Sequence, residues 1–413
     1  STRALSSAAS DVYKRQVVTL LSSFGTLFGI GGSVLFSVRL GAGDKKNARK
    51  ILANSFSYLI IVSLALTLIF LVTKDQLLNW FGASEVTFSY ADAYMTIYTA
   101  GTFFALLGTG MNYFITAQGF PLLGMTTTLI GAVVNIVLDP VFIFLFDMGV
   151  AGAAVATVLA QMCSCAFVLC TLRRKRMPVS LAIVRPDRDT GKRIVKIGFS
   201  PFLILASDSI IIIALNAVLQ YYGGPEYGDT LITAATIVQS YMLLITSPML
   251  GITGGSQPLI SFNYGANRPD RIRKTFFWVL ALCVCFTSVM FLISRIMPQH
   301  FVRIFTDEPE YAKLAVWGIR VFTLMIIPLS FQYVIVDGLT ALGMTKISLS
   351  LSLTRKTLYF AATCLIPLIW TAQSAFYAEP FADGVAACLS CVTFFFIYRK
   401  YLRGAGRLGE IRL

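Results

Sequence analysis

Residues 31–50 read GGSVLFSVRLGAGDKKNARK, and residues 255–274 read GSQPLISFNYGANRPDRIRK. Aligned without a gap at an offset of 224 residues, the two stretches agree at seven of twenty positions. The shared residues are Gly31/Gly255, Leu35/Leu259, Ser37/Ser261, Gly41/Gly265, Ala42/Ala266, Arg49/Arg273 and Lys50/Lys274. The same offset also matches Thr116, Ala117 and Gly119 to Thr340, Ala341 and Gly343. Two matches in one register predict a duplicated architecture.

The composition predicts a membrane protein. Of the 413 residues, 56% are hydrophobic and only 13% are charged, whereas soluble domains average about 25% charged residues. Apolar runs long enough to cross about 30 Å of hydrocarbon recur along the chain, and strand-type alternation is absent, which leaves helices as the spanning element. We therefore expect an all-α polytopic membrane protein. The apolar segments are about 17–40, 51–72, 95–117, 123–146, 150–172, 194–222, 231–262, 276–296, 316–342, 348–370 and 384–401.

The net charge is +14, and the charged residues are concentrated in the loops between the apolar segments. Alternate loops are basic and the intervening ones are mostly acidic, which is the positive-inside pattern. It predicts a multi-pass cell-membrane protein whose basic loops and carboxy terminus face the cytoplasm and touch anionic lipid head groups, and it disfavours a nucleic-acid partner. The basic residues are Lys45, Lys46, Arg49, Lys50, Arg173, Arg174, Lys175, Arg176, Arg185, Arg188, Lys192, Arg193, Arg268, Arg271, Arg273, Lys274, Arg399, Lys400, Arg403 and Arg407; the acidic ones are Glu85, Asp147, Glu226, Asp229, Asp307, Glu308, Glu310 and Glu379.

The repeat and the charge pattern together predict two lobes. Both copies of the Gly-Ala…Arg-Lys element lie on the cytoplasmic side, so the lobes are expected to be parallel and pseudo-symmetric. Helix 194–222 maps to positions before residue 1, which predicts five plus six helices here and six plus six in a complete protein. The expected organisation is a non-native or disordered amino terminus (1–16), an N-lobe (17–173), a cytoplasmic linker (174–193), a C-lobe (194–401) and a basic tail (402–413).

Several chemistries are disfavoured by what the sequence lacks. His300 is the only histidine, so a histidine-based metal centre or catalytic triad is not expected. Cys388 and Cys391 form a C-x-x-C pair inside an apolar segment, whereas a zinc site needs four ligands. A G-x-x-x-x-G-K-[ST] phosphate-binding loop is absent, which disfavours direct use of ATP. We therefore expect no enzyme and no cofactor.

Ionisable residues inside apolar segments are candidates for a functional role, because inserting each into the membrane costs about 2.5–3.5 kcal/mol on insertion scales. Asp139 follows Asn135 by four residues, so both side chains share one helix face, and Pro140 frees a nearby carbonyl. Such hard oxygen ligands suit a small cation, and the buried carboxylate could instead carry a proton. The alternative is that Asp139 caps a helix break before Pro140.

Two further acids, Asp208 and Asp337, are candidates for a cation or substrate site. Asp208 could instead be a structural acid held by the neighbouring serines, and Gly338 could permit a kink beside Asp337. Arg355 and Lys356 lie about two turns inside a segment end. We expect them to extend to the cytoplasmic surface.

The chain resembles the bacterial multidrug and toxic compound extrusion (MATE) transporters. The pieces that carry the resemblance are GGSVLFSVRLGAGDKKNARK, NIVLDPVFIF with GVAGAAVATVLAQ, GITGGSQPLISFNYGANRPDRIRK, and TALG with the downstream Arg355. The resemblance implies two six-helix lobes around a central cavity. It also implies export of cationic or amphipathic organic compounds in exchange for Na⁺ or H⁺, by a protein expected to be a monomer.

Residues of the family's amino-lobe cation site match Asn135, Asp139, Thr157 and the backbone of Ala153, so the resemblance implies a site for H⁺ or Na⁺ there. No other metal is expected. The family also uses an acid on the first helix, which the repeat predicts to lie before residue 1 of this sequence. Its carboxy-lobe site uses acids on helices where Asp208 and Asp337 lie, in a different surrounding pattern. The alternative within transport is a flippase for lipid-linked oligosaccharides or peptidoglycan precursors, whose cavity should be lined by Arg and Lys.

Overall fold

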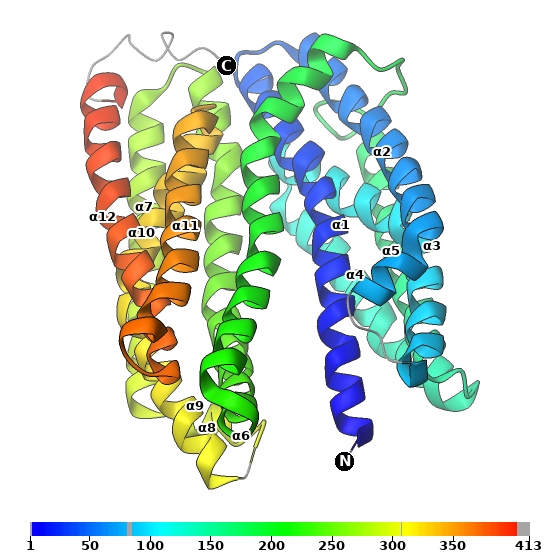
Figure 1. The fold of residues 1–413 in the computed structure, drawn as a ribbon. Coiled ribbons are helices and arrows are strands. Elements are labelled where there is room, and N and C mark those ends of the chain that lie inside the picture. Colours follow the sequence, from blue (N-terminus) through cyan, green and yellow to red (C-terminus); the bar gives the residue numbers. More distant parts are fainter. Residues whose placement is uncertain (1, 81–84, 307, 403–413) are drawn as a thin grey trace. The chain divides into compact units, whose positions relative to one another are not determined.

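The computed structural model describes residues 2–80, 85–306 and 308–402 (Figure 1). This part of the chain is built from helices and short turns and contains no strand. The chain divides into two compact units, Ser1–Ala206 and Ser207–Leu413, here called unit 1 and unit 2. The helices are α1 (Thr2–Gly41), α2 (Lys45–Trp80), α3 (Glu85–Ala117), α4 (Pro121–Pro140), α5 (Gly149–Arg173), α6 (Arg188–Gly265), α7 (Pro269–Ile296), α8 (Pro298–Val302), α9 (Pro309–Phe322), α10 (Ile326–Ala341), α11 (Thr345–Ile369) and α12 (Ala378–Ile397).

Within the described residues, nine helical stretches are long and apolar enough to cross a membrane. They coincide with nine of the eleven apolar segments, and the other two segments, 95–117 and 348–370, lie in α3 and α11. α11 is helical over its whole length but carries Lys346, Arg355 and Lys356 among its apolar residues. The prediction of an all-α, multi-pass membrane protein is confirmed.

The largest differences from the expected boundaries concern α1 and α6. Residues 1–16 are expected to be non-native or disordered; in the structure α1 begins at Thr2, and neither glycine nor proline occurs in the chain before Gly25. The chain between α5 and α6 is shorter than the expected linker, since α6 begins at Arg188 and continues past the division between the units. Gly224, with φ of 72°, interrupts α6 and separates two spans. The basic tail beyond Leu402 lies outside the described residues.

The backbone repeats itself at the offset found in the sequence. The turn after α1 has a left-handed residue at Gly43, and the turn after α6 has one at Asn267, 224 residues later. Each turn is closed by the same hydrogen bond, from the amide of Asp44 to the carbonyl of Arg39 and from the amide of Arg268 to the carbonyl of Asn263, at 2.9 Å in both cases. This is the pattern of a helix that ends in a Schellman motif.

A second pair of turns obeys the same offset. Gly119 after α3 and Gly343 after α10 both have positive φ, of 89° and 76°. The amide of Phe120 donates to the carbonyl of Ile115, and the amide of Met344, 224 residues later, donates to that of Leu339. The ends of α5 and α12, at Arg173 and Ile397, also differ by 224. The sequence repeat therefore corresponds to a repeat of helices and turns, in which α1–α5 match the second half of α6 through α12.

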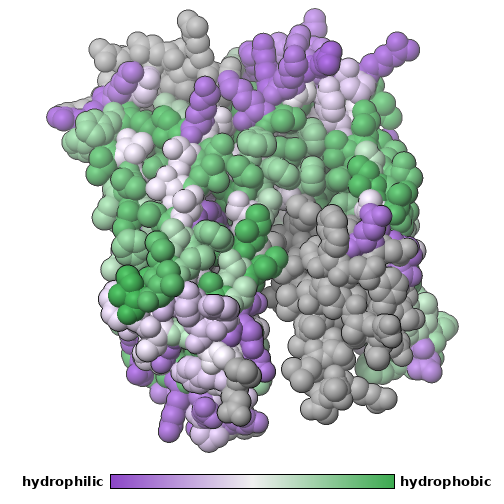
Figure 2. Space-filling model, viewed as in Figure 1, coloured by the Kyte–Doolittle hydropathy of each residue, from purple (hydrophilic) through white to green (hydrophobic). Residues whose placement is uncertain are grey.

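On the surface of unit 2, apolar and polar side chains are distributed as expected for a protein that spans a bilayer. Along the middle of its helices Figure 2 shows mainly hydrophobic side chains, with hydrophilic ones gathered towards the helix ends. Large apolar side chains are exposed on α7 and α12, among them Trp278, Leu282, Val392 and Phe396. An apolar surface of this extent is unfavourable in water and suits contact with lipid.

The chain between α5 and α6 is fastened to α2 within unit 1. The amide of Asp187 donates to Asn54 Oδ1 at 2.6 Å, and the Tyr58 hydroxyl donates to the Asp187 carbonyl at 3.1 Å. Lys50 forms an ion pair with the Asp187 carboxylate at 2.9 Å. That carboxylate also accepts from the amide of Thr190, so Asp187 acts as the N-cap of α6.

Candidate functional site

A polar group in unit 1 joins α4 to α5. Asn135 Nδ2 lies 3.1 Å from Asp139 Oδ1 and 3.4 Å from Thr157 Oγ1, and donates to both. The Thr157 hydroxyl in turn donates to the carbonyl of Ala153 at 2.9 Å. The structure thus brings together the four residues that the sequence singled out, Asn135, Asp139, Ala153 and Thr157. All four are partly exposed, so the group is accessible within the apolar part of the unit.

The backbone beside Asp139 departs from a regular α-helix. Pro140 ends α4, and residues Val141–Leu145 form a π-helical turn. Because Pro140 has no N–H, it cannot donate to the carbonyl of Ile136 one turn earlier. The carbonyl of Ile136 therefore has no partner in the N–H of the residue four positions later, and the expectation that it serves as a ligand beside Asp139 stays a prediction. Single π-helical turns inside α-helices are frequently found at functional sites.

The oxygen atoms of this group suit a small hard cation. A carboxylate, a carboxamide oxygen, a hydroxyl and a backbone carbonyl are the ligand types that such ions take in proteins. The amide of Asn135 presents its NH₂ to the carboxylate, and turning it by half a rotation would present its oxygen instead. These are the atom types that would be needed to hold a proton on Asp139 or a cation among the oxygens.

The two acids expected in the carboxy lobe have different partners in unit 2. Asp208 on α6 forms an ion pair with Lys356 on α11. Asp337 on α10 faces the side chains of Thr253 and Gln257 on α6. The structure pairs Asp208 with a lysine, which offsets its charge, whereas Asp337 faces neutral polar groups.

Unit 2 also holds a buried charge cluster that the sequence did not predict. Arg355 on α11 donates through Nε to Asp383 Oδ1 at 2.6 Å and through Nη2 to Glu379 Oε1 at 2.7 Å. Arg355, Glu379 and Asp383 are buried, and Asp383 is 0% exposed. The expectation that Arg355 and Lys356 extend to the cytoplasmic surface is therefore wrong, because carboxylates of unit 2 pair with both. Glu379 lies in the first turn of α12 and not in an exposed loop.

A signal for this cluster was present in the sequence. Glu379 and Asp383 are four residues apart and so share one helix face. The apolar segment was expected to begin at residue 384, which placed both acids in a loop, whereas α12 begins at Ala378 after the turn Ala372–Tyr377.

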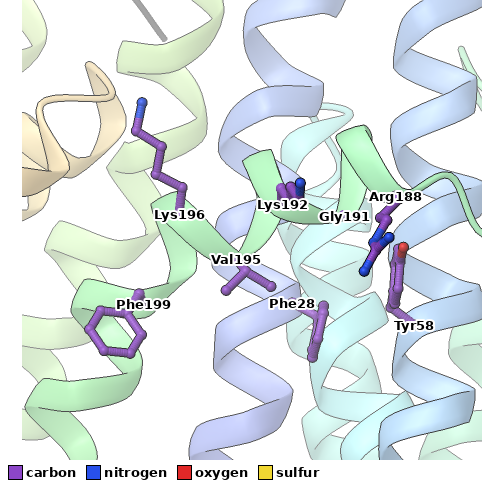
Figure 3. A pocket seen from close by; sticks show the side chains of 8 residues that line it. All are labelled: Phe28, Tyr58, Arg188, Gly191, Lys192, Val195, Lys196 and Phe199. Atoms are coloured by element: carbon purple, nitrogen blue, oxygen red, sulfur yellow. The ribbon is translucent and has the colours of Figure 1, made fainter.

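A groove in unit 1 combines aromatic and basic side chains. Phe28 of α1 and Tyr58 of α2 are stacked, with ring centroids 5.9 Å apart and an interplanar angle of 9°. Arg188, Lys192 and Lys196 follow one another at four-residue steps on α6, and Figure 3 shows Arg188 beside the Tyr58 ring while Lys196 points away from Phe28. The groove has a volume of ≈ 500 Å³ and is lined by Phe28, Tyr58, Arg188, Gly191, Lys192, Val195, Lys196 and Phe199.

Known proteins resemble the chain in sequence. The MatE family model matches residues 12–141 and 205–365. Multidrug export protein MepA of Staphylococcus haemolyticus (strain JCSC1435) is 25% identical over 365 residues, which cover 87% of this chain and 77% of that protein. Multidrug export protein MepA of Staphylococcus aureus (strain MSSA476) is 27% identical over 313 residues, which cover 74% of this chain and 67% of that protein.

Solved structures share the fold. A crystal structure of MATE in complex with MaL6 superposes with a TM-score of 0.88 at 21% identity, covering 98% of this chain and 89% of that one. A MOP superfamily transporter from Pyrococcus furiosus, described as having a binding pocket of reverse polarity, gives a TM-score of 0.87 at 22% identity and covers 95% and 88% of the two chains. The family model matches more than half of the residues of this chain. The chain therefore belongs to the MatE family, the MATE transporters.

Proposed function

We propose that this chain is a multidrug efflux transporter that exports cationic or amphipathic organic compounds in exchange for Na⁺ or H⁺. Membership of the MATE family and the multidrug export proteins among its relatives support the transport class. The observation that supports coupling of export to Na⁺ or H⁺ is the polar group formed by Asn135, Asp139 and Thr157 with the carbonyl of Ala153. Transport of this kind needs no covalent chemistry, in keeping with a protein that is not an enzyme.

The coupling follows from differential affinity. A cation or proton that binds at Asp139 stabilises the conformation in which the α4–α5 group is closed around it. If the exported compound binds better to another conformation, each ligand disfavours the other and their gradients are linked. We propose that the two units alternate access to the two sides of the membrane in this way. Asp337 stays a candidate for a second cation or substrate acid; Asp208 is a weaker one because Lys356 pairs with it.

The setting of the proposed transporter follows from the charge pattern. We propose that the protein acts as a monomer in the cell membrane, with its basic loops and carboxy terminus on the cytoplasmic side. Its partners would be a small organic substrate and membrane lipid, and nucleic acid would not be among them.

The direct test is the substitution Asp139→Asn. It keeps the shape of the side chain and a hydrogen bond to Asn135 but removes the charge that a cation or proton must neutralise. We expect gradient-driven efflux of a cationic dye such as ethidium to fall to the level of cells without the protein, while membrane insertion is unchanged. Efflux is followed by the fluorescence of preloaded cells.

The matched control is Asp189→Asn, which changes an exposed aspartate in the first turn of α6. It should leave efflux unchanged. If Asp139→Asn inserts normally and still exports the dye at the rate of the unchanged protein, the assignment of coupling to the α4–α5 group is wrong. In a separate experiment, transport by the unchanged protein in proteoliposomes, with Na⁺ and pH gradients imposed one at a time, would identify the coupling ion.

One observation favours the flippase alternative. The groove of Figure 3 places Arg188 and Lys192 beside the aromatic rings of Phe28 and Tyr58, a combination that suits a lipid carrying a phosphate group. The basic side chains lie in the first turns of α6, close to the polar linker, which also suits ordinary contact with lipid head groups. Translocation of a fluorescent pyrophosphate lipid in proteoliposomes, with no dye efflux from cells, would rank the flippase first.

A further inference from the structure

The cluster of Arg355, Glu379 and Asp383 holds one positive and two negative groups when all three are ionised. Its neighbouring ammonium, on Lys356, is engaged by Asp208. The cluster therefore carries a net charge of −1 inside unit 2. A charge that is removed from water and left uncompensated costs several kcal/mol even after relaxation, so such a group calls for a counter-charge or a proton.

The hydrogen bonds around the cluster leave one oxygen open. Asp383 Oδ1 accepts from Arg355 Nε, whereas Asp383 Oδ2 is buried and has no hydrogen-bond partner within the described residues. Asp383 is 0% exposed, so its carboxylate lies away from bulk solvent. A buried carboxylate oxygen in this position is satisfied once it carries a proton or meets another donor.

The titratable groups around the cluster lie on α10, on α6 and on α11, the helix of Arg355 itself. Tyr333 and Asp337 belong to α10, Lys356 and Tyr359 to α11, and Asp208 to α6. The two tyrosines are neutral hydroxyls, and the Lys356–Asp208 pair has no net charge. Asp337 is a further acidic group near Tyr333, so none of these neighbours offsets the excess charge of the triad.

The repeat shows that the fold itself does not require this triad. At the offset of 224, Arg355 corresponds to Gly131, Glu379 to Val155 and Asp383 to Leu159. α4 and α5 of unit 1 thus pack with uncharged residues at all three positions. Unit 1 places its own polar group at Asn135 and Asp139, which correspond to Tyr359 and Thr363 in unit 2. The helix pair α4–α5 of unit 1 and the equivalent pair α11–α12 of unit 2 therefore each carry an ionisable cluster, but at different turns.

We propose that Glu379 and Asp383 form a proton-binding site in which the two carboxylates share one proton beside Arg355. In the loaded state one carboxylate oxygen forms an O–H bond with a proton from water, and the net charge of the triad changes from −1 to zero. Release returns the proton to water. The guanidinium lies against both carboxylates and repels a metal cation, whereas a proton fits on an oxygen. The proposal goes beyond the transport function, and its test needs no transport assay.

The experiment is infrared spectroscopy of the purified full chain at neutral pH in deuterated buffer, where protonated carboxyl groups absorb apart from carboxylates. We expect the wild type to show a protonated-carboxyl band. In the double variant Glu379→Gln/Asp383→Asn, the intensity of this band should fall by the equivalent of one carboxyl group per chain. The double variant keeps the shape of the cluster and a neutral partner for each contact. The controls Asp337→Asn and Glu310→Gln should keep the band component that the double variant loses.

A second measurement needs no substitution. In the wild type, ¹³C labelling of either the aspartate or the glutamate carboxyl carbons should shift that band component, because the shared proton is on one of the two residue types. The proposal is overturned if the wild type has no protonated-carboxyl band, or if the double variant has the same band as the wild type. It is also overturned if saturating Na⁺ removes the band component from the wild type, since the site would then take a metal ion.

Discussion

Arg355 links α11 to α12 through buried ion pairs with Glu379 and Asp383. It is the only cation that the structure shows within bonding distance of Glu379 and Asp383 among the described residues. We expect Arg355→Met to lower the free energy of unfolding by about 3–5 kcal/mol, because it leaves buried carboxylates without their partner. The loss would be seen as a lower Tm of the purified protein. Arg303→Met, at an exposed position, should leave the Tm unchanged.

Asp187 predicts a dependence of stability on pH. Hydrogen bonds from the Thr190 side chain and from Lys50 lower the pKa of Asp187 from 3.8 to about 2. A carboxyl whose pKa is lower in the folded state stabilises the fold at every pH above 3.8, and that contribution is lost as the pH falls towards 2. Asp187→Asn removes the charge while keeping a side chain that can cap α6.

The expected result is a Tm difference between wild type and Asp187→Asn that is constant near neutral pH and shrinks below pH 3.8. Thermal melts of the purified protein across this range provide the measurement. Asp189→Asn serves as the control, because Asp189 is exposed and forms no ion pair within the part of the chain that the structure describes. A difference that stays constant down to pH 2 would contradict the role given to the charge.

At the residue scale, the sequence was informative where two polar groups shared a helix face within a recognised apolar segment. Asn135 and Asp139 met this condition, and the structure shows them in contact with Thr157. Their role in coupling stays a prediction. Glu379 and Asp383 share a face in the same way, but the partner that explains them, Arg355, is 24 and 28 residues away in sequence. Pairing at that distance depends on how α11 packs against α12, which spacing within one helix cannot show.

At the scale of elements, the close contact of α1 with α6 in unit 1 depends on Gly198. A methyl group at this position would overlap the carbonyl oxygen of Leu27 on α1. We therefore expect Gly198→Ala to separate the helices and to lower the free energy of unfolding by about 1–3 kcal/mol, as overpacking does. The measurement is the Tm of the purified protein.

Gly255→Ala is the matched control, because a methyl group on Gly255 meets no atom within 4 Å. Alanine also has the higher helix propensity, by about 1 kcal/mol, so this variant should melt at the same temperature as the wild type or above it. Equal losses in both variants would show that Gly198 has no special packing role.

Apolar run length predicted the number and order of the segments better than their ends. The helices extend past the apolar runs because polar residues such as those of Lys45–Lys50 continue the helix once it has left the hydrocarbon. Hydropathy reports burial in lipid and not backbone conformation. For the same reason it could not show that one helix, interrupted at Gly224, would contain two apolar segments.

At the scale of the whole molecule, the charge pattern predicts one orientation in the membrane. In a background without the eight native cysteines, we expect Lys46→Cys and Arg271→Cys to react with a membrane-impermeant maleimide only from the cytoplasmic side. Glu310→Cys should react only from outside. Labelling of intact cells and of inverted vesicles makes the measurement, and labelling of Lys46→Cys on intact cells would reverse the predicted topology.

The repeat was the part of the whole molecule that the sequence predicted most closely. Seven identities in twenty positions were enough to set an offset that the helix ends and the left-handed turn residues then obey. Turn geometry persists because a left-handed residue after a helix tolerates few side chains, and Asn267 in place of Gly43 is one of the few alternatives. The chemistry inside the lobes is not repeated, so the offset could not reveal the triad.

That contrast between shared turns and unshared charges describes how such a chain could change after a gene doubles. The turns that end matching helices have the same backbone geometry in both halves, whereas equivalent positions within the helix pairs carry an ionisable group in one half and none in the other. Gly131 and Arg355 stand at equivalent positions and have diverged completely. The two halves can therefore specialise separately, and a substitution tolerated in one copy gives no guide to its effect in the other.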